Sequence, residues 1–311
     1  MPINCATKRL ASRFVFFSVA AMLFAACAWA GPPYSVKGIV LKVDKPHRTL
    51  VVSCRSIPGY MDAMVMLFSV HQAKELEGIV PGAAIDFTLV ADERAAYAED
   101  IHVHDFETLE QDPLGARRLK LLDTIVAPAA QTPLINAGQH VPDFALVDQN
   151  SQPVTLSQFS GKVVAITFMY THCPLPNFCF RLTNNFGRLQ KRFAGQMGRD
   201  LVLLSVTFDP QHDTPEILAK YGDIWKADPK GWRLLTGPQP DIEKLCHELG
   251  MNFWPDEGIM AHSLHTVILD RHGDLVANLE GNEFTADQLG DLVQTVMTRT
   301  PARSHRSASG E

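Results

Sequence analysis

The sequence predicts two folded units in one chain, a small all-β barrel followed by an α/β domain. Short apolar strands separated by turn signals fill residues 31–106. Apolar strands alternate with amphipathic helices over residues 141–299. The region between them, residues 107–140, ends in a stretch that is rich in Ala, Pro and Gly and lacks apolar periodicity. Such a composition is typical of a linker, which would let the two domains approach or part.

Residues 1–30 are predicted to be an export signal. Three basic residues precede the apolar run 14–26, and the small-x-small triplet 28–30 offers a cleavage site. Two alternatives are a lipoprotein signal that ends in an acylated Cys27, and an uncleaved anchor, for which the apolar run is short. All three place the remainder in the periplasm or on the extracytoplasmic face of the membrane, and the two alternatives attach it to the membrane.

Charge and cysteine content narrow the classes of function. Removing residues 1–30 deletes three positive charges and no negative ones, so the formal net charge falls from −6 to −9. An acidic exported protein is a poor candidate for binding nucleic acid. The four cysteines that remain are too few for a disulfide scaffold in a chain of this size, so each needs its own explanation. They are Cys54, Cys173, Cys179 and Cys246.

The N-terminal unit is predicted to be a small closed barrel of the OB-like type. About five short strands fall within some 70 residues, and turns rich in Pro and Gly separate them. The expected strands are YSVKGIVLKVD, RTLVVSC, AMVMLFSV, AAIDFTLVA and YAEDIHVHDF.

Sulfur side chains gather in the second and third of these strands. Met64 and Met66 are two positions apart, so on a strand they face the same way. A hairpin through Pro58-Gly59 would bring Cys54 close to them. One thiolate and two thioethers form a soft ligand set that suits Cu(I) or Ag(I) rather than zinc or calcium. The alternative is that the methionines simply fill the core of the barrel.

The runs YSVKGIVLKVD, IPGYMDAMVM and VPGAAIDFTL resemble the CusF-like family of periplasmic copper-binding domains. The resemblance implies a Cu(I) site on the face of a small barrel, with Met64 and Met66 as the family's Met-x-Met pair. Met61 falls where an aromatic residue often caps the metal. Cys54 stands where the family has a histidine, and this departure still supplies a soft ligand for Cu(I).

Residues 141–299 contain two strand–helix units, then a hairpin and a final helix, which together predict an α/β sandwich of thioredoxin type. The segment VVAITFMY is an apolar strand that precedes a helix over residues 179–192. The strand LVLLSVTFD is followed by Thr214-Pro215, which opens a helix to about residue 227. The remaining expected elements are the strand WRLLTG, the helix DIEKLCHELG, the hairpin HTVILDRHGDLVANLEG and a helix over residues 285–298. Residues 300–311 are predicted to be a disordered tail.

Cys173 and Cys179 lie at the junction of the first strand and the first helix of this domain. On one helix, residues six positions apart would point ~120° apart. Pro174 and Pro176 also forbid a regular helix between the cysteines, so the thiols must come from a loop or from the helix start. One interpretation is a structural disulfide, as in many exported proteins. The other is a chemical site, because α/β folds place sites at this junction and a wide loop lets two sulfurs converge on a metal.

The motifs FMYTHCPLPNFC, SVTFDPQHDTPEILAKYG and AHSLHTVILDRHGDLV, in that order, resemble the Sco/SenC family. These are thioredoxin-fold copper proteins that help to assemble the dinuclear copper centre of cytochrome oxidase. The resemblance implies that Cys173, Cys179 and His262 bind one copper ion and that Asp209 lies near the site. The family usually has three residues between its cysteines, whereas this chain has five. Two thiolates and an imidazole suit both Cu(I) and Cu(II).

Three neighbouring residues have simpler expectations. His172 either lowers the pKa of Cys173 when it is protonated or faces solvent. His265 follows His262 by three positions and on a strand would face the opposite way. Cys246 lies on the apolar side of its helix and is expected to be a buried free cysteine.

The sequence therefore favours a metallochaperone over an enzyme: an exported protein that captures copper and delivers it. The client would be the copper-bearing subunit of cytochrome c oxidase or another periplasmic copper protein. One alternative is a thiol–disulfide oxidoreductase that uses Cys173 and Cys179 to reduce the copper-site cysteines of a client. Another is copper buffering or resistance. His262 favours copper binding, because a pure oxidoreductase needs no imidazole at that point.

Overall fold

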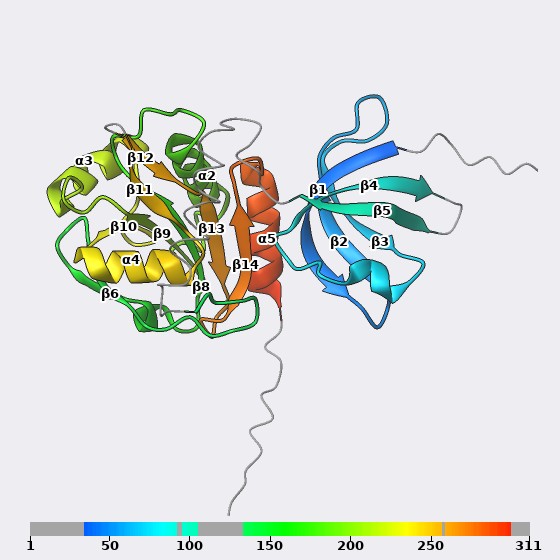
Figure 1. Ribbon diagram of the computed structural model, residues 1–311, viewed down its shortest axis with the longest axis horizontal. Coiled ribbons are helices and arrows are strands. Elements are labelled where there is room, and N and C mark those ends of the chain that lie inside the picture. The colour runs from blue at the N-terminus through cyan, green and yellow to red at the C-terminus, as the bar shows by residue number, and fades with distance from the viewer. Residues whose placement is uncertain (1–33, 92–94, 105–132, 257–258, 300–311) are drawn as a thin grey trace, which may run out of the picture.

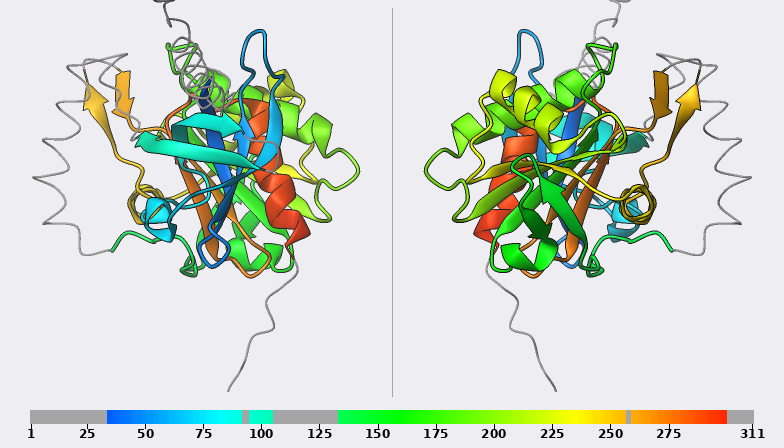
Figure 2. Two further views of the ribbon diagram at one scale, coloured as in Figure 1. Left: turned by 90° about the vertical axis from the view of Figure 1, so that its right-hand side faces the viewer. Right: turned by 90° about the vertical axis from the view of Figure 1, so that its left-hand side faces the viewer.

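A small barrel and an α/β domain lie side by side in the computed structural model, with helix α5 (Ala286–Thr298) between them (Figures 1 and 2). The structure describes residues 34–91, 95–104, 133–256 and 259–299. The expected signal with Cys27, the linker as far as residue 132 and the tail 300–311 lie outside these ranges. Within the described ranges, no helix is both long enough and apolar enough to span a bilayer.

Five strands close the N-terminal barrel in the order β1-β2-β3-β5-β4. Alternation of side chains forms its core: in β4, Ile85, Phe87 and Leu89 are buried, whereas their neighbours along the strand are partly exposed. The expected small β-barrel is therefore present, and its finer OB-like assignment stays a prediction. The strands are β1 (Tyr34–Asp44), β2 (Thr49–Cys54), β3 (Met64–Ser69), β4 (Ala84–Ala91) and β5 (Ala96–His104), with a short 3-10 helix η1 (Ala73–Leu76) after β3.

A seven-stranded sheet in the order β14-β13-β8-β9-β10-β6-β7 forms the centre of the C-terminal domain. Strands β8, β9 and β10 are parallel, and the β13–β14 hairpin adds to β8 in the antiparallel direction. Two parallel strand–helix units, a hairpin and a closing helix are the thioredoxin-type order that the sequence predicts. The strands are β6 (Ala145–Asp148), β7 (Pro153–Thr155), β8 (Val163–Met169), β9 (Leu201–Thr207), β10 (Trp232–Thr236), β11 (Phe253–Asp256), β12 (Ile259–His262), β13 (His265–Leu269) and β14 (Leu275–Glu280).

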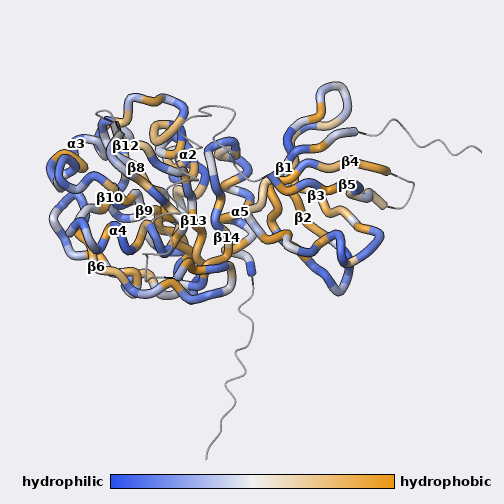
Figure 3. The backbone as a smooth tube through the Cα atoms, in the orientation of Figure 1, coloured by the Kyte–Doolittle hydropathy of each residue, from blue (hydrophilic) through white to orange (hydrophobic). Residues whose placement is uncertain are grey.

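Helices cover both faces of this sheet. Val163 and Ala165 of β8 pack in one core with α2 and α5, whereas Val164 and Ile166 pack in a second core with α4. Because β8 and β9 are buried on both faces, both are almost wholly apolar, and hydrophobic residues are concentrated in the strands (Figure 3). The helices are α2 (Cys179–Arg192), α3 (Pro215–Trp225), α4 (Gln239–Glu248) and α5, and a 3-10 helix η3 (Leu156–Phe159) follows β7.

Two helices begin at the threonines that the sequence marks as helix starts. Thr214 precedes α3 and accepts a hydrogen bond from the backbone N–H of Ile217. Thr285 precedes α5 and forms a reciprocal capping box with Gln288, at 3.0 and 3.1 Å. These side chains satisfy N–H groups that have no partner within the helix, which fixes both helix starts.

The last part of the expected linker belongs to the α/β domain. Ile135 N–H donates to the carbonyl of Glu248, and Gly138 N–H donates to the carbonyl of Leu275. The sequence assigns residues 135–140 to the linker because they lack periodicity, whereas the structure holds them against the domain by such backbone hydrogen bonds. The β6–β7 and β11–β12 hairpins are likewise additional to the elements that the sequence predicts.

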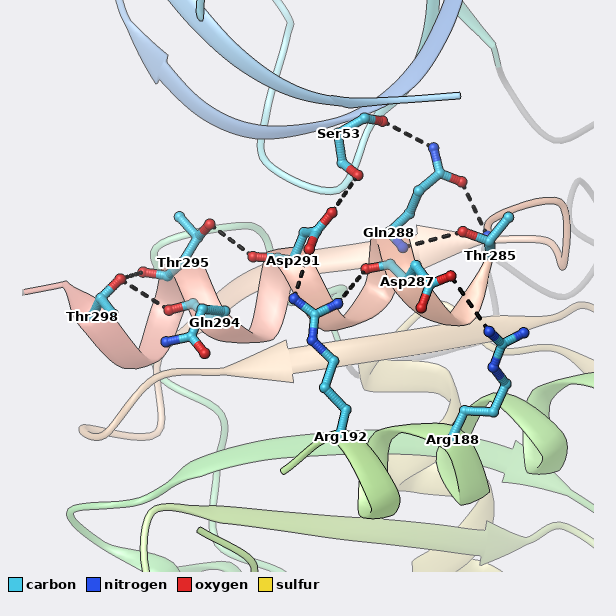
Figure 4. Close-up of polar contacts among 10 residues, drawn as sticks. All are labelled: Ser53, Arg188, Arg192, Thr285, Asp287, Gln288, Asp291, Gln294, Thr295 and Thr298. Atoms are coloured by element: carbon cyan, nitrogen blue, oxygen red, sulfur yellow. Dashed lines mark hydrogen bonds and ion pairs between the residues drawn. The ribbon is translucent and has the colours of Figure 1, made fainter. Parts of the chain in front are cut away.

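The barrel docks on α5 through polar and apolar contacts. Ser53 of β2 donates from Oγ to Asp291 at 2.7 Å and accepts at its carbonyl from Nε2 of Gln288 at 2.9 Å (Figure 4). Asp291 also pairs with Arg192 of α2 at 2.7 Å, so one carboxylate joins the barrel, α5 and α2. Ile39 and Leu41 of β1 enter the same apolar core as α5.

Candidate metal centre

The loop that holds Cys173 begins where β8 ends, and a buried carboxylate anchors it. Thr171 donates to Asp213 from its backbone N–H at 3.0 Å and from its hydroxyl at 2.5 Å. Thr207, the last residue of β9, donates to the same carboxylate at 2.6 Å. Asp213 is fully buried. It therefore ties together the carboxyl ends of two parallel strands, where an open α/β sheet places its ligand site.

Cys179 is the first residue of α2, and its thiol is buried. Prolines 174 and 176 keep the preceding segment out of a helix, so Cys173 remains in the loop and is partly exposed. The structure has both cysteines as free thiols. One thiol thus faces the protein interior and the other is accessible from solvent.

His262 comes from a distant part of the chain, at the end of β12. Its Nε2 lies 3.6 Å from Sγ of Cys179, and its Nδ1 lies 2.8 Å from the carbonyl oxygen of Ser263. Because a carbonyl can only accept, Nδ1 carries the proton, and in the neutral imidazole the lone pair of Nε2 faces the sulfurs. Tyr170, Phe178 and Phe208 surround the ring with centroid distances of 5.8, 6.1 and 4.8 Å. The imidazole is therefore held in one orientation.

The ligand atoms of Cys173, Cys179 and His262 all lie within 4.8 Å of one another. Hydrogen bonding from the Cys179 thiol lowers the pKa of Cys173 to about 4, whereas burial raises the pKa of Cys179. Of the two thiols, Cys173 is therefore the one that loses its proton more readily. Two sulfurs and one imidazole nitrogen match the preferences of copper in either oxidation state, and the donor set fits that ion.

The three sulfur residues of the barrel, Cys54, Met64 and Met66, lie on one face of the strands but differ in burial. Cys54 lies directly opposite Met64 in the β2–β3 ladder, and Met66 lies opposite Val52, so the three sulfur side chains share one face. Cys54 is buried, Met66 is partly buried against the barrel core together with Met61, and Met64 is 50% exposed. Burial raises the pKa of Cys54 to about 12, so a metal ion would have to displace the thiol proton.

The structure also places the three neighbouring residues for which the sequence supports simpler expectations. His265 is buried, and its Nδ1 lies 2.9 Å from the side-chain oxygen of Asn278, away from the thiols. Cys246 is buried and free, as predicted. His172 is partly exposed and faces Asp209 at 3.7 Å. Sequence reasoning missed His212 and Asp213, although both lie in the DPQHDTP run that contains Asp209.

Comparison with known families separates the two domains. The SCO1/SenC family model matches residues 133–298. The chain belongs to the SCO1/SenC family. A second model, described as copper binding periplasmic protein CusF, matches residues 33–103. Copper is thus named in the description of the family that matches the N-terminal domain.

Individual relatives each match part of the chain. An SCO2-like protein of Rickettsia typhi is 30% identical over 142 residues, which cover 43% of this chain and 66% of the relative. The SCO1 homologue of Bacillus subtilis is 29% identical over 107 residues, covering 34% and 54%. The chain thus spans between about half and two thirds of these relatives. The solved structure of a SCO1/SenC family lipoprotein of Bacillus anthracis is 24% identical, with a TM-score of 0.47 and coverage of 53% and 99%.

Proposed function

We propose that this Sco protein captures copper outside the cytoplasm and delivers it to a client, the copper-bearing subunit of cytochrome c oxidase or another periplasmic copper protein. The single observation that carries the proposal is the convergence of Cys173, Cys179 and His262 within 4.8 Å. The apolar N-terminal segment supports an extracytoplasmic location, with membrane attachment through a lipid on Cys27 or through an uncleaved signal.

Each residue has a defined task in binding the cargo. Cys173 offers an accessible thiolate that makes first contact with the incoming ion. Cys179 then loses its proton as it binds, because only a thiolate is an effective ligand. His262 needs no rearrangement, since the Ser263 carbonyl already holds its tautomer. An accessible ligand also gives the client a point at which to begin ligand exchange.

The barrel would act as a first acceptor for Cu(I) through Met64, Met66 and Cys54. Arg55, the neighbour of Cys54, and Arg181, two residues after Cys179, both donate to the carbonyl of Glu283, at 2.5 and 3.4 Å. An arginine near each candidate site therefore reaches the same short segment of the chain, the connection between β14 and α5. Exchange between sites of similar softness has no large affinity gap to overcome, and a tether raises the effective concentration to about the mM range.

Anaerobic Cu(I) titration of the exported chain tests both halves of the proposal. The wild-type protein should bind two equivalents, and one should be lost in Cys173→Ser/Cys179→Ser and, separately, in Met64→Leu/Met66→Leu. Matched controls are Cys246→Ala and Met251→Leu, which change buried sulfur residues elsewhere and should keep both equivalents. If the cysteine double variant still binds two equivalents, the thiol site is excluded. If the methionine double variant does, the barrel site is excluded. Copper that binds but never reaches an apo-oxidase domain would favour buffering.

The low pKa of Cys173 favours a second candidate, thiol–disulfide exchange. The Cys173 thiolate would attack a client disulfide and form a mixed disulfide, releasing one client thiolate. Cys179 would then lose its proton, attack Cys173 and release the second client thiolate, so the client gains two electrons and a Cys173–Cys179 disulfide remains. His262→Ala separates the candidates, because it should impair copper delivery more strongly than disulfide reduction: it removes a copper ligand, whereas for Cys173 it removes only one of the hydrogen bonds that lower its pKa.

A further inference from the structure

Two imidazoles and two carboxylates form a second cluster immediately beside Cys173. His172 comes from the loop after β8, and His212 comes from the loop between β9 and α3. Their ring centroids lie 4.2 Å apart at an angle of 53°. The side chains are 44% and 48% exposed, so both rings are accessible from solvent. Ligand atoms of His172, His212 and Asp213 lie within 4.8 Å of one another.

Asp213 acts in this cluster as the group that orients His212. Its two oxygens already accept hydrogen bonds from Thr171 and Thr207, and Oδ1 lies 2.9 Å from Nδ1 of His212. A carboxylate that accepts from Nδ1 fixes the proton there and leaves the Nε2 lone pair for an ion. Metal-binding histidines are characteristically held by such a carboxylate.

His172 supplies the second imidazole, and Asp209 lies beside it, outside the group whose ligand atoms converge within 4.8 Å. Nε2 of His172 lies 3.7 Å from Oδ2 of Asp209, which is longer than a hydrogen bond. Two ligands that each lie ~2.0–2.2 Å from one ion are separated by about 3.0–3.6 Å, so the spacing is close to that of a shared ion. The His172 ring also packs edge-on against Tyr170 at 4.8 Å and 89°, which restricts its rotation.

We propose that His172 and His212 form the centre of a second metal site for a divalent transition ion, with Asp209 beside His172, and that Cu(II) binds there most tightly. Two imidazole nitrogens and a carboxylate oxygen suit Cu(II) and Zn(II) and are a poor set for Cu(I). The stability order of divalent ions places Cu(II) above Zn(II) at such a site. The peptide bond between His172 and Cys173 makes this hard-donor site a direct neighbour of the thiol site. The assignment stands independently of copper delivery by the thiols.

Cu(II) titration of the full exported chain, purified without a histidine tag, tests the site. The background is Cys173→Ser/Cys179→Ser/His262→Ala, in which the neighbouring ligands are absent. One equivalent should bind, with nitrogen hyperfine structure in the electron paramagnetic resonance spectrum and no sulfur-to-copper charge-transfer band. Adding His172→Ala or His212→Ala should weaken binding at least about tenfold. The matched control is His71→Ala, since His71 is an exposed histidine paired with a single carboxylate, Glu99, at 3.0 Å.

The proposal would be overturned if the background variant bound no Cu(II). It would also be overturned if adding His172→Ala or His212→Ala left the Cu(II) affinity of the background variant unchanged. If the background variant does not fold, wild-type protein with its sulfur sites filled by Ag(I) provides the second measurement. Calorimetric titration with Zn(II) should then show one equivalent that His212→Ala removes and His71→Ala retains. An Ag(I)-filled protein that binds no Zn(II) would equally exclude the site.

Discussion

Sγ of Cys179 lies 3.6 Å from Nε2 of His262, although 83 positions separate the two residues in the chain. The β11–β12 hairpin brings the histidine to this point, and Ser263 holds it there in two ways. Its backbone N–H donates to the carbonyl of Asn252, and its hydroxyl oxygen accepts from the N–H of Asn252. The imidazole is thus preorganised before any ion binds.

His262→Ala should lower copper affinity at least about tenfold, because it removes a nitrogen donor and leaves both thiols in place. Competition with a chromophoric Cu(I) chelator measures the loss. His140→Ala is the control, since it removes an exposed histidine that pairs with Asp274 outside the site. Equal affinities for His262→Ala and wild type would show that the thiols alone hold the ion.

Cys173 should react with iodoacetamide at a rate that is nearly constant from pH ~5 to pH ~8 and declines below pH ~4, because its pKa is lowered to about 4. Cys179→Ala removes the hydrogen bond that lowers this pKa, so the profile should move to higher pH, whereas Cys246→Ala should not move it. Peptide mass spectrometry at a series of pH values measures the rates. A wild-type rate that climbs tenfold per pH unit through neutrality would contradict the thiolate assignment.

Acid should destabilise the fold through His265. Burial lowers the pKa of His265 from its usual value of about 6.5. Just below that pH, the imidazole is therefore protonated in the unfolded chain and neutral in the native state. The unfolded state then binds more protons, and the free energy of unfolding should fall by up to about 1.4 kcal/mol per pH unit as the pH drops below ~6.5. Urea unfolding at a series of pH values should give a shallower dependence for His265→Gln. Parallel curves for the two proteins would exclude this role.

The contact between Ser53 and Asp291 should contribute measurably to docking. A double-mutant cycle with Ser53→Ala and Asp291→Ala should give a coupling of about 1–2 kcal/mol, because a hydroxyl donates to a largely shielded carboxylate. The control cycle is Arg188 with Asp287, an exposed pair at 3.4 Å in the same helix interface, which should give less than about 0.5 kcal/mol. Chemical denaturation of the four proteins in each cycle measures both values, and equal couplings would argue against docking through Ser53.

Elements with local signals were predictable from the sequence. The start of α5 follows from Thr285 and Gln288, which satisfy N–H groups within one turn. β11 and β12 were not predictable, because each has only four residues, too few for a clear periodicity, and each depends on the other as its pairing partner. The segment 135–140 looks like a linker for a related reason: the hydrogen bonds that hold it to the domain go to residues more than a hundred positions away, such as Glu248 and Leu275.

The residues of the candidate site likewise fall into those that the sequence could indicate and those that depend on tertiary structure. The position of Cys173 and Cys179 at a strand–helix junction left a disulfide and a chemical site open, and the ligand set with His262 could be assigned only through family resemblance. The orienting contact of Asp213 with His212 is a tertiary relationship between loop residues, so no pattern predicts it. Cys54 is buried and Met64 is half exposed although the two residues are paired across β2 and β3. The strand pattern alone could not predict this difference in burial.

The position of the barrel also determines how much of the sheet edge at β14 another molecule could reach (Figure 1). β14 is an edge strand of the seven-stranded sheet, and an uncovered edge is a template for pairing with another molecule. The barrel turn at Gly82 lies so close to Ala277 of β14 that a side chain at that glycine would collide with it. Ile39 and Leu41 cover apolar surface beside the same strand. A chain shortened to the α/β domain would therefore expose both the edge and its apolar flank to other molecules.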